Sequence, residues 1–339
     1  MKVDRYSCPL SVIIPVHNGG ENFRKCLLSL ANSDVVPAEV IVVADGDTDG
    51  SGDLAEAHGA RVFRFSSAGG PARARNCGAK LAQGDILFFI DADVEVHPTT
   101  IGQVIAAFQS DRQLAALIGS YDDRPGDPGF LSQYRNLLHH YVHQTGRREA
   151  FTFWGACGAI QREAFQAVGG FDERYIRPCI EDIELGYRLR QAGYKIELHR
   201  EIQVKHLKRW GAASMMWADV FYRAIPWATL ILRAGKMDSD LNLQHSNRLS
   251  VVLAFGVLLG LVGAIWLPPS LVFAIAAFLG LIALNFSLYR FFQTKRGLLF
   301  CLCVIPWHWL FYFYSGVAFA IALGRYWLQP TYRGSSQVS

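Results

Sequence analysis

The longest stretch of this sequence without a charged side chain limits what the chain can fold into more than any other feature. Residues 249–289 contain no Asp, Glu, Lys or Arg, whereas charged residues are spread throughout residues 1–200. A segment this apolar would not stay soluble on a surface, and it is long enough to cross a lipid bilayer twice. We therefore expect a polar N-terminal region followed by membrane-spanning helices.

Three apolar segments are expected to span the membrane. The first is 249–267, a tight turn of two prolines and a serine follows at 268–270, and the second segment is 271–289. The third covers 298–323. Each segment has the length of a helix that crosses a bilayer. A soluble helical domain with buried hairpins is the alternative interpretation.

Basic residues predict the orientation of these spans. Arg248 precedes the first apolar segment, and Arg290, Lys295 and Arg296 lie between the second and the third. Positively charged flanks favour the cytoplasmic side of the membrane. We expect a multi-pass protein of the plasma (inner) membrane with its N-terminal domain in the cytoplasm. The two arginines of the tail after Gly324 oppose this orientation weakly.

Charge and cysteine usage exclude further classes of protein. The net charge of +4 is mild and does not indicate a nucleic-acid-binding protein. The early apolar run 12–16 is too short for a signal peptide and continues into the polar HNGGEN. The seven cysteines form no CxxC pair, which favours a reduced cytoplasmic domain without structural zinc.

Strand and helix patterns alternate in the N-terminal region. The runs SVIIPVHN and AEVIVVADG are rich in β-forming residues, and NFRKCLLSLANS between them has helical spacing. GPARARNCGAKLAQG predicts a further helix, with Pro71 at its first position and Gly84 as its stop. This order predicts an α/β fold with a parallel sheet and right-handed crossovers, whose ligands bind beyond the carboxyl ends of the strands.

The run ILFFIDADVEVHP ends a buried strand in two acids. Residues 86–90 are all apolar and predict a strand covered on both faces. Asp91 and Asp93 follow, and side chains at i and i+2 of a continuing strand point to the same side, so both carboxylates can converge on one ligand. Such oxygens suit Mg²⁺ or Mn²⁺ carrying a phosphate. Solvated acids at a strand-to-turn junction are the alternative.

The common glycine-rich phosphate-binding signatures are absent from the sequence. It contains no GxGxxG after the first strand and no GxxxxGK[ST] anywhere. The charge of a bound phosphate must therefore be met by other groups. We expect a metal held by Asp93 to do this, and Arg73 and Arg75 near a helix start can add to it.

Five segments, taken in order, resemble a known family. SVIIPVHNGG, VIVVADGDTDGS, ARNCGAKLAQGDILFFIDADVEV, GACGAIQREAFQAVGGFDE and EDIELGYRLRQAGYKI are similar to the successive motifs of family-2 glycosyltransferases with the GT-A fold. The match covers residues 9–210. The resemblance implies a GT-A, Rossmann-like nucleotide-sugar-binding domain, which the apolar segments extend with an all-α transmembrane region.

The resemblance implies a donor pocket at the strand ends. Pro15, Val16 and Asp45 would line the nucleotide base and ribose, and Asp91 would contact the ribose or the metal. The family often has two acids where this chain has Ala44 and Asp45, so only the second acid is carried over. A turn-capping role for Asp45 is the alternative.

The same resemblance implies residues around the diphosphate. Asp93 would hold Mg²⁺ or Mn²⁺ against it, and Arg75 and Asn76 match the ARN segment that contributes to donor binding. Solvated positions on a helix are the alternative for Arg75 and Asn76.

The EDIE segment opens an expected amphipathic helix. Acids in a first helical turn commonly do no more than complement the helix dipole. In the family this pair supplies the catalytic base. Asp182 would take the proton from the acceptor hydroxyl as that oxygen attacks the anomeric carbon, with inversion, and Glu181 would orient the acceptor or the base.

The HLKRW segment closes the resemblance. Processive synthases of the family carry QxxRW, and here His206 occupies the Gln position, which makes it a candidate metal ligand; an ordinary surface histidine is the alternative. Arg209 and Trp210 are candidate acceptor-binding residues, and Trp210 can equally anchor at the membrane interface.

A mixed aromatic and basic segment follows the catalytic region. Residues 212–234 predict a helix that lies in the membrane interface and is broken near Pro226. The expected organisation is a catalytic domain at 1–210, an interfacial helix and linker at 211–248, a transmembrane region at 249–325 and a tail at 326–339.

The sequence predicts a membrane-anchored enzyme that transfers a sugar from a nucleotide-sugar donor to a lipid or lipid-linked acceptor, as in the synthesis of cell-envelope glycans or glycolipids. A processive polysaccharide synthase and a non-catalytic, nucleotide-sugar-binding membrane scaffold are the alternatives. The segment YRNLLHHYVHQTGRR is either an acceptor lid or an amphipathic helix.

Overall fold

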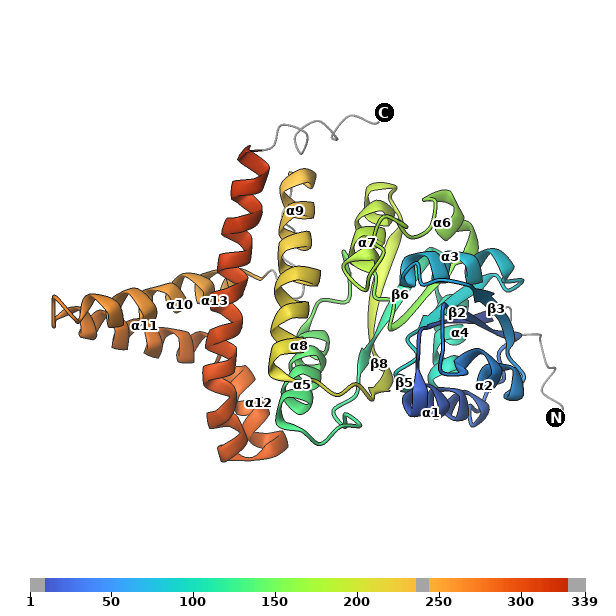
Figure 1. Cartoon of the computed structure of the whole chain (residues 1–339), viewed down its shortest axis with the longest axis horizontal. Coiled ribbons are helices and arrows are strands. Elements are labelled where there is room, and N and C mark those ends of the chain that lie inside the picture. The colour runs from blue at the N-terminus through green and yellow to red at the C-terminus, as the bar shows by residue number, and fades with distance from the viewer. Residues whose placement is uncertain (1–9, 236–243, 329–339) are drawn as a thin grey trace. The chain divides into compact units, whose positions relative to one another are not determined.

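The protein divides into two compact units in a computed structural model (Figure 1). The first unit is Met1–Trp210 and the second is Gly211–Ser339. The structure describes residues 10–235 and 244–328. Most of the predicted tail, including the second of its two arginines, lies outside the described residues.

The first unit is built on one eight-stranded sheet. Its strand order is β3-β2-β1-β4-β7-β6-β8-β5. The strands are β1 (Leu10–Val16), β2 (Glu39–Asp45), β3 (Arg61–Phe65), β4 (Ile86–Ile90), β5 (Val94–Val96), β6 (Leu114–Tyr121), β7 (Cys157–Gln161) and β8 (Lys195–His206).

One half of this sheet agrees with the parallel arrangement expected from the sequence. The strands β3, β2, β1 and β4 pair in parallel. In the other half, β7 is antiparallel to both β4 and β6, and β5 is antiparallel to β8. The sheet is therefore mixed, and its antiparallel pairs involve β5, β6, β7 and β8, which all follow the last strand predicted from the sequence.

Helices cover the sheet on both faces. They are α1 (Gly20–Ala31), α2 (Ser51–Ala57), α3 (Pro71–Leu81), α4 (Thr100–Ser110), α5 (Phe130–Thr145), α6 (Arg162–Ala167) and α7 (Glu181–Gln191). Helix α3 begins at Pro71, as predicted, because proline needs no amide partner in the first helical turn. Helix α5 contains most of the segment for which a lid was the alternative interpretation.

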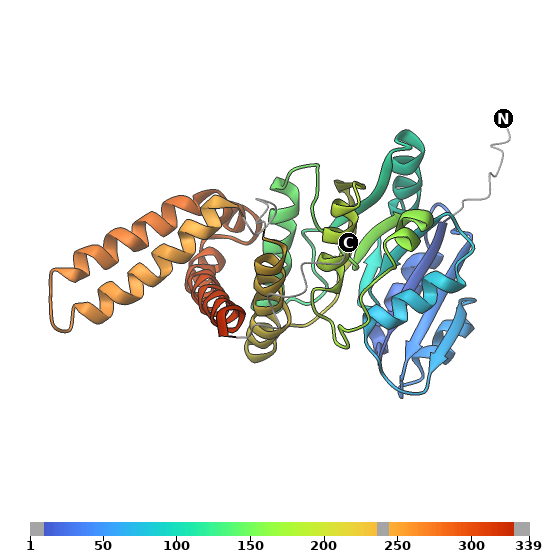
Figure 2. The ribbon, with the colours of Figure 1, turned by 90° about the horizontal axis from the view of Figure 1, so that it is seen from above.

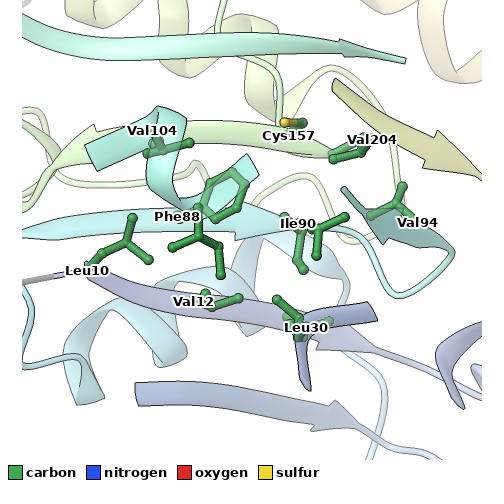
Figure 3. Close-up of a cluster of buried hydrophobic side chains, with 14 of the residues drawn as sticks. Leu10, Val12, Leu30, Phe88, Ile90, Val94, Val104, Cys157 and Val204 are labelled. Carbon is green, nitrogen blue, oxygen red and sulfur yellow. The ribbon is translucent and has the colours of Figure 1, made fainter. Parts of the chain in front are cut away.

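Alternate residues of β1 face different helices, as its period of two requires. Val12 and Ile14 belong to a core cluster with Phe23 and other residues of α1. Ile13 points to the opposite face, where its Cγ2 lies 2.5 Å from the position that a Cβ on Gly78 would take. Figure 3 shows part of the cluster, in which side chains of several strands meet. This rigid centre holds the carboxyl ends of β1, β2 and β4 side by side.

The second unit is helical. It contains α8 (Ala212–Trp217), a π-helical turn η1 (Ala218–Ala224), α9 (Ile225–Ala234), α10 (His245–Gly263), α11 (Ser270–Leu284), α12 (Phe286–Arg296) and α13 (Leu298–Leu328). The widened turn η1 lies just before Pro226, where the expected helix was predicted to break. A proline lacks an amide hydrogen and its ring clashes with the preceding turn, so the local change of pitch has a physical cause.

Two helices of this unit are long and apolar enough to cross a membrane, namely α10 and α13. The second predicted span is divided into α11 and α12, whose axes differ by 65°. The described residues therefore contain two candidate spans, or three if the bent pair counts as one. Asn285 separates the two helices, and its amide donates to the Ser250 hydroxyl of α10 at 3.0 Å. The Tyr312 hydroxyl of α13 donates to the Asn285 amide oxygen at 2.8 Å.

Candidate active site at the strand ends

The predicted donor-pocket residues lie next to one another at the ends of β1 and β2. Val16 is paired with Ala44 in the parallel register, and Pro15 with Val43. The Asp45 carboxylate is buried and accepts hydrogen bonds from the amides of Gly69 and Gly70, between 2.7 and 3.0 Å. These amides start the segment that leads into α3. Asp45 thus ties the end of β2 to that segment, and its carboxylate caps the loop before α3.

Arg75 occupies the centre of the site. It lies on the first turns of α3 and is 4% exposed, so the alternative of a solvated helix position is wrong. Its guanidinium donates to Asp91 Oδ1 at 2.7 Å and to Glu181 Oε1 at 2.9 Å. One buried cation therefore joins the end of β4 to the start of α7.

Gly155 provides the space that Arg75 needs. A Cβ at this position would lie 2.8 Å from the Arg75 Cζ atom, which is closer than real Cβ contacts allow. The Gly155 amide also donates to Asp182 Oδ2 at 3.0 Å. This residue was not predicted from the sequence as part of the site, because a single glycine in the run FTFWGACG gives no local signal of its contacts.

Asn76 uses its side chain within the protein. Its amide nitrogen donates to the Phe171 carbonyl at 2.8 Å and to Glu173 Oε1 at 2.9 Å. Its amide oxygen accepts from the Phe171 amide at 2.8 Å. The residue is 7% exposed, so it is not solvated either. Together, Asn76 and Arg75 hold the two ends of the segment 171–181, which leads to the predicted catalytic pair.

The two acids of that pair have different environments. Glu181 accepts from Arg75 and, through its second oxygen, from the Cys179 amide at 2.8 Å. Asp182 accepts from the amides of Gly155 and Ile183, at 3.0 and 2.8 Å. Burial, and then repulsion by Glu181, raises the pKa of Asp182 to about 6. Asp182 is thus suited to hold a proton transiently, whereas the negative charge of Glu181 is balanced by the Arg75 guanidinium.

Asp91 and Asp93 have different partners. The chain turns after β4, so the two residues are not on one continuing strand. Asp91 contacts Arg75, whereas Asp93 Oδ2 lies 3.8 Å from His206 Nε2. The backbone brings Asp93 and His206 together, because Val94 is paired with His206 and the Leu207 amide donates to the Asp93 carbonyl at 2.8 Å.

His206 is a buried residue and not an ordinary surface histidine. It is 7% exposed, and the Tyr121 ring stacks on it with centroids 4.3 Å apart and an angle of 12° between the planes. Tyr121 also contacts the ring of Trp154, at 4.7 Å between centroids. Sequence reasoning missed Tyr121 and Trp154. In the sequence, each of them is only an aromatic residue close to a glycine, and this does not indicate a binding site.

The acids make the site strongly negative. Of the four acids Asp91, Asp93, Glu181 and Asp182, only Asp91 and Glu181 pair with the buried guanidinium of Arg75, and burial followed by repulsion from Asp91 raises the pKa of Asp93 to about 6. A phosphate would add further negative charge, so a bound cation is electrostatically favourable. Among the described residues no group of three or more His, Cys, Asp or Glu side chains converges on one point. Asp93 and His206 nevertheless fit a divalent ion that takes its remaining ligands from phosphate oxygens and water.

The remaining predicted residues lie at the end of the first unit. Arg209 is exposed. Trp210 is half-buried, its amide donates to the Ser132 hydroxyl of α5 at 2.8 Å, and Lys208 Nζ lies 4.6 Å from the centroid of its ring. Their predicted role in acceptor binding stays a prediction.

Comparison with protein families agrees with this geometry. Residues 11–169 match the model of glycosyl transferase family 2, and residues 136–210 match a model described as the N-terminal domain of galactosyltransferase. Residues 11–169 thus form a glycosyltransferase family 2 domain. The resemblance expected from the five segments is thereby confirmed.

Two curated relatives illustrate the sequence similarity. Validoxylamine A glucosyltransferase of Streptomyces hygroscopicus subsp. limoneus is 30% identical over 226 residues, which are 57% of this chain and 50% of the relative. The uncharacterized glycosyltransferase YibD of Escherichia coli (strain K12) is 40% identical over 95 residues, which are 26% of this chain and 27% of the relative. The chain thus spans about half the length, or less, of these relatives.

Solved structures show the fold. Mannosyltransferase PcManGT of Pyrobaculum calidifontis, determined with GDP-Man and Mn²⁺, has a TM-score of 0.56 at 18% identity and covers 94% of this chain and 88% of its own. GalNAc-T7, determined with UDP, GalNAc and Mn²⁺, has a TM-score of 0.52 at 18% identity, with 73% of this chain and 51% of its own covered. The chain therefore has a GT-A-like mixed sheet followed by C-terminal helices.

Proposed function

We propose that the protein is a membrane-anchored, inverting glycosyltransferase that moves one sugar from a nucleotide sugar to a lipid or lipid-linked acceptor, with a divalent cation bound beside the donor. The observation that carries this proposal is the position of Arg75. It hydrogen-bonds Asp91 at the donor end of the site and Glu181, the neighbour of the predicted base. The donor and the base are thus expected on opposite sides of the buried Arg75 guanidinium.

Asp182 is the proposed general base. Its carboxylate is held by two backbone amides and is not hydrogen-bonded to Arg75. Near neutral pH it is ionised and ready to accept the proton of the acceptor hydroxyl while that oxygen bonds to the anomeric carbon and the bond from this carbon to the donor phosphate breaks. A displacement in one step inverts the anomeric configuration.

Asp93 and His206 are the proposed protein ligands of Mg²⁺ or Mn²⁺. When bound, the cation would neutralise charge on the diphosphate leaving group. The structural neighbours that were determined with Mn²⁺ support the use of a divalent cation. The Tyr121 ring packed on His206 restricts the orientation of the imidazole and so helps to keep its Nε2 toward Asp93.

Membrane anchoring is supported by the second unit. Its helices α10 and α13 have the length and composition of membrane spans. In the predicted interfacial segment, the exposed rings of Trp217 and Phe221 contact each other with centroids 4.3 Å apart. Adjacent aromatic side chains on a helix that also carries arginines are typical of a segment at the lipid–water interface. An enzyme held there is suited to an acceptor that lies in the membrane.

The first test is a binding screen of the detergent-purified protein against UDP-, GDP- and dTDP-sugars, by thermal shift with and without Mn²⁺. The expected result is a stabilisation that needs Mn²⁺ and occurs with one nucleotide class. Product analysis with that donor and membrane lipid extracts then tests transfer and inversion. If the folded protein is not stabilised by any of the donors, the proposed donor chemistry is wrong.

A further inference from the structure

The helices α10 and α11 form a hairpin, in which the two helices lie side by side (Figures 1 and 2). Small residues allow this close approach. A Cβ on Gly260 would lie 2.8 Å from the Ala274 Cβ, and one on Gly256 would lie 3.3 Å from the Ala277 Cβ. Such small-residue contacts are typical of helix pairs packed in a lipid environment. The two helices therefore behave as one rod-like element.

The open end of this hairpin is polar. Asn285, which follows α11, contacts Ser250 of α10 at 3.0 Å. The Tyr312 hydroxyl contacts both Asn285 and, at 3.0 Å, Asn247 of α10. Basic residues continue this end of the hairpin, on α12 and before the apolar part of α10. The start of α10 and the end of α11 thus lie together among polar side chains.

The closed end, the segment 264–270, has the sequence AIWLPPS and no charged residue. Ile265, Trp266 and Leu267 are 72%, 77% and 62% exposed. A turn that emerges into water on the far side of a membrane does not need to present its largest apolar side chains outward. Lipid hydrocarbon is the environment that matches this surface.

The backbone of the turn is also adapted to the absence of water. Every residue from Ala264 to Val272 that has an amide hydrogen donates it to a carbonyl of the hairpin, at 2.8 to 3.2 Å. The two prolines carry no amide hydrogen. The Ser270 hydroxyl donates to the Leu267 and Gly260 carbonyls at 2.7 and 3.1 Å. An unsatisfied donor is costly in hydrocarbon, so this pattern lowers the cost of burying the turn in lipid.

The apolar legs of the hairpin are also short. Helix α11 has 15 residues, which corresponds to about 22 Å of helical rise, and the part of the 19-residue α10 that follows Arg248, residues 249–263, has the same length. The hydrocarbon core of a bilayer is about 30 Å thick. Because α12 turns away by 65° after Asn285, it does not lengthen the leg along the same axis. By contrast, α13 has 31 residues, or about 46 Å, and can cross the whole bilayer.

We infer that α10 and α11 form a re-entrant hairpin, which enters the membrane from the side of Arg248 and Lys295 and returns without its tip reaching the opposite aqueous phase. This inference rests on the proposed membrane anchoring. It proposes a hairpin in place of two complete spans in this region: the exposed apolar tip lies in lipid hydrocarbon, α10 does not cross although it is long and apolar enough to do so, and α13 is the helix that crosses.

The test uses the full chain in sealed vesicles of both orientations, with exposed Cys303 replaced by serine to lower the background. Leu267→Cys reports on the tip, and Thr294→Cys, exposed on α12, is the matched control. A membrane-impermeant maleimide is expected to label Thr294→Cys from one side. It should leave Leu267→Cys unlabelled from either side until detergent is added. A nitroxide on Leu267→Cys should be more accessible to oxygen than to a water-soluble nickel chelate.

Labelling of Leu267→Cys from the side opposite to Thr294→Cys would overturn the inference and establish two complete spans. A different failure concerns the proposed function. If the protein remained in the supernatant without detergent and both cysteines were labelled alike, the membrane anchoring itself would be wrong. Unchanged nucleotide-dependent thermal stabilisation of the two variants checks that the substitutions leave the first unit folded.

Discussion

Arg75 and Glu181 lie 106 positions apart in the sequence, and their side chains form a buried ion pair with Nη1 and Oε1 2.9 Å apart. The same guanidinium contacts Asp91, so a single residue of α3 connects β4 to α7. Its Nε atom is buried and has no hydrogen-bond partner among the described residues. The Arg75–Glu181 pair thus connects the elements of the site, although one donor of the guanidinium is left without a hydrogen bond.

Replacing Arg75 by methionine should destabilise the protein by about 3–5 kcal/mol, because Glu181 would remain buried without a counter-charge. Denaturant unfolding of the detergent-solubilised protein measures this loss. The control is Arg61→Met on β3, where the arginine side chain is half exposed and the expected change is below about 1 kcal/mol. Adding Glu181→Gln to Arg75→Met should recover part of the stability. If Arg75→Met and Arg61→Met lowered the free energy of unfolding equally, the central role of Arg75 would be contradicted.

Asp182→Asn should retain nucleotide binding and lose transfer activity by about 10²–10⁴-fold, since an amide cannot accept the proton of the acceptor hydroxyl. Binding is followed by thermal shift and transfer by product formation under single-turnover conditions. Asp172→Asn, on a loop where the carboxylate pairs with Arg174, is the matched control. Near-normal turnover of the Asp182 variant would remove Asp182 from the role of base.

The rate of transfer should rise with pH through a midpoint near 6, because Asp182 must be deprotonated to act and its pKa is raised to about 6. The measurement is kcat/KM between pH 5 and 8 at saturating cation. A rate that stays constant over this range, as an aspartate with an ordinary pKa near 4 would give, would show that the carboxylate is not in the buried environment described here.

The same raised pKa of Asp182 predicts a change in stability with a definite sign. The folded protein disfavours the ionised carboxylate, so this group reduces the free energy of unfolding as pH rises from the ordinary value of 3.8 through about 6. Asp182→Asn should therefore be more stable than the wild type at pH 8, by up to about 3 kcal/mol. The difference should vanish at about pH 3, below both pKa values, where the wild-type group is mostly protonated in both states. Thermal unfolding at the two pH values checks this, and a constant difference would contradict it.

Asp93→Ala and His206→Ala should each weaken the Mn²⁺-dependent part of nucleotide binding by about tenfold or more, which is about 1.4 kcal/mol. Chelation of the cation should have the same effect on the wild type and little further effect on either variant. Glu95→Ala is the control, because Glu95 lies on β5, two residues after Asp93, but faces Lys205 at 3.7 Å. If the control weakened binding as much as Asp93→Ala, the assignment of the metal ligands would fail.

Asn76→Asp should loosen the segment 171–181 without changing nucleotide affinity, because the substitution removes the amide donors to Phe171 and Glu173 while keeping the side-chain volume. Leaving these acceptors unsatisfied costs about 1–3 kcal/mol locally. Hydrogen exchange of the segment is the measurement, with Asn32→Asp on the exposed end of α1 as control. A loss of nucleotide affinity with unchanged exchange would instead support the direct donor-binding role expected from the sequence.

Local patterns explain why part of the first unit could be predicted. Strands β1, β2 and β4 are runs of apolar residues, and Pro71 marks the start of α3. The helix α2 and the strand β3 were not predicted. The sequence RVFRF of β3 mixes two arginines with three apolar residues without strict alternation, and it lies at the edge of the sheet, where only one neighbour strand supports it. Its structure depends on pairing with β2 more than on its own composition.

Residue identity was easier to predict than residue contact in the site. The acids at 91, 93, 181 and 182 were all expected to act there. Their partners were not, since Asp91 and Asp93 were expected to converge and instead face Arg75 and His206. A turn of two residues after β4 separates them, and its geometry depends on how β5 pairs with β8.

The sequence by itself determined the family-2 glycosyltransferase class, the apolar character of the C-terminal region and the residue types available for chemistry, because these follow from composition, periodicity and ordered motifs. Only the tertiary structure decided that Arg75 neutralises Glu181 and leaves Asp182 available, and that Asn285 ends α11 where a continuous span was expected. Both depend on contacts between residues distant in the chain, such as Asn285 with Ser250 and Tyr312. Such contacts are set by the packing of whole elements, which no short stretch of sequence specifies.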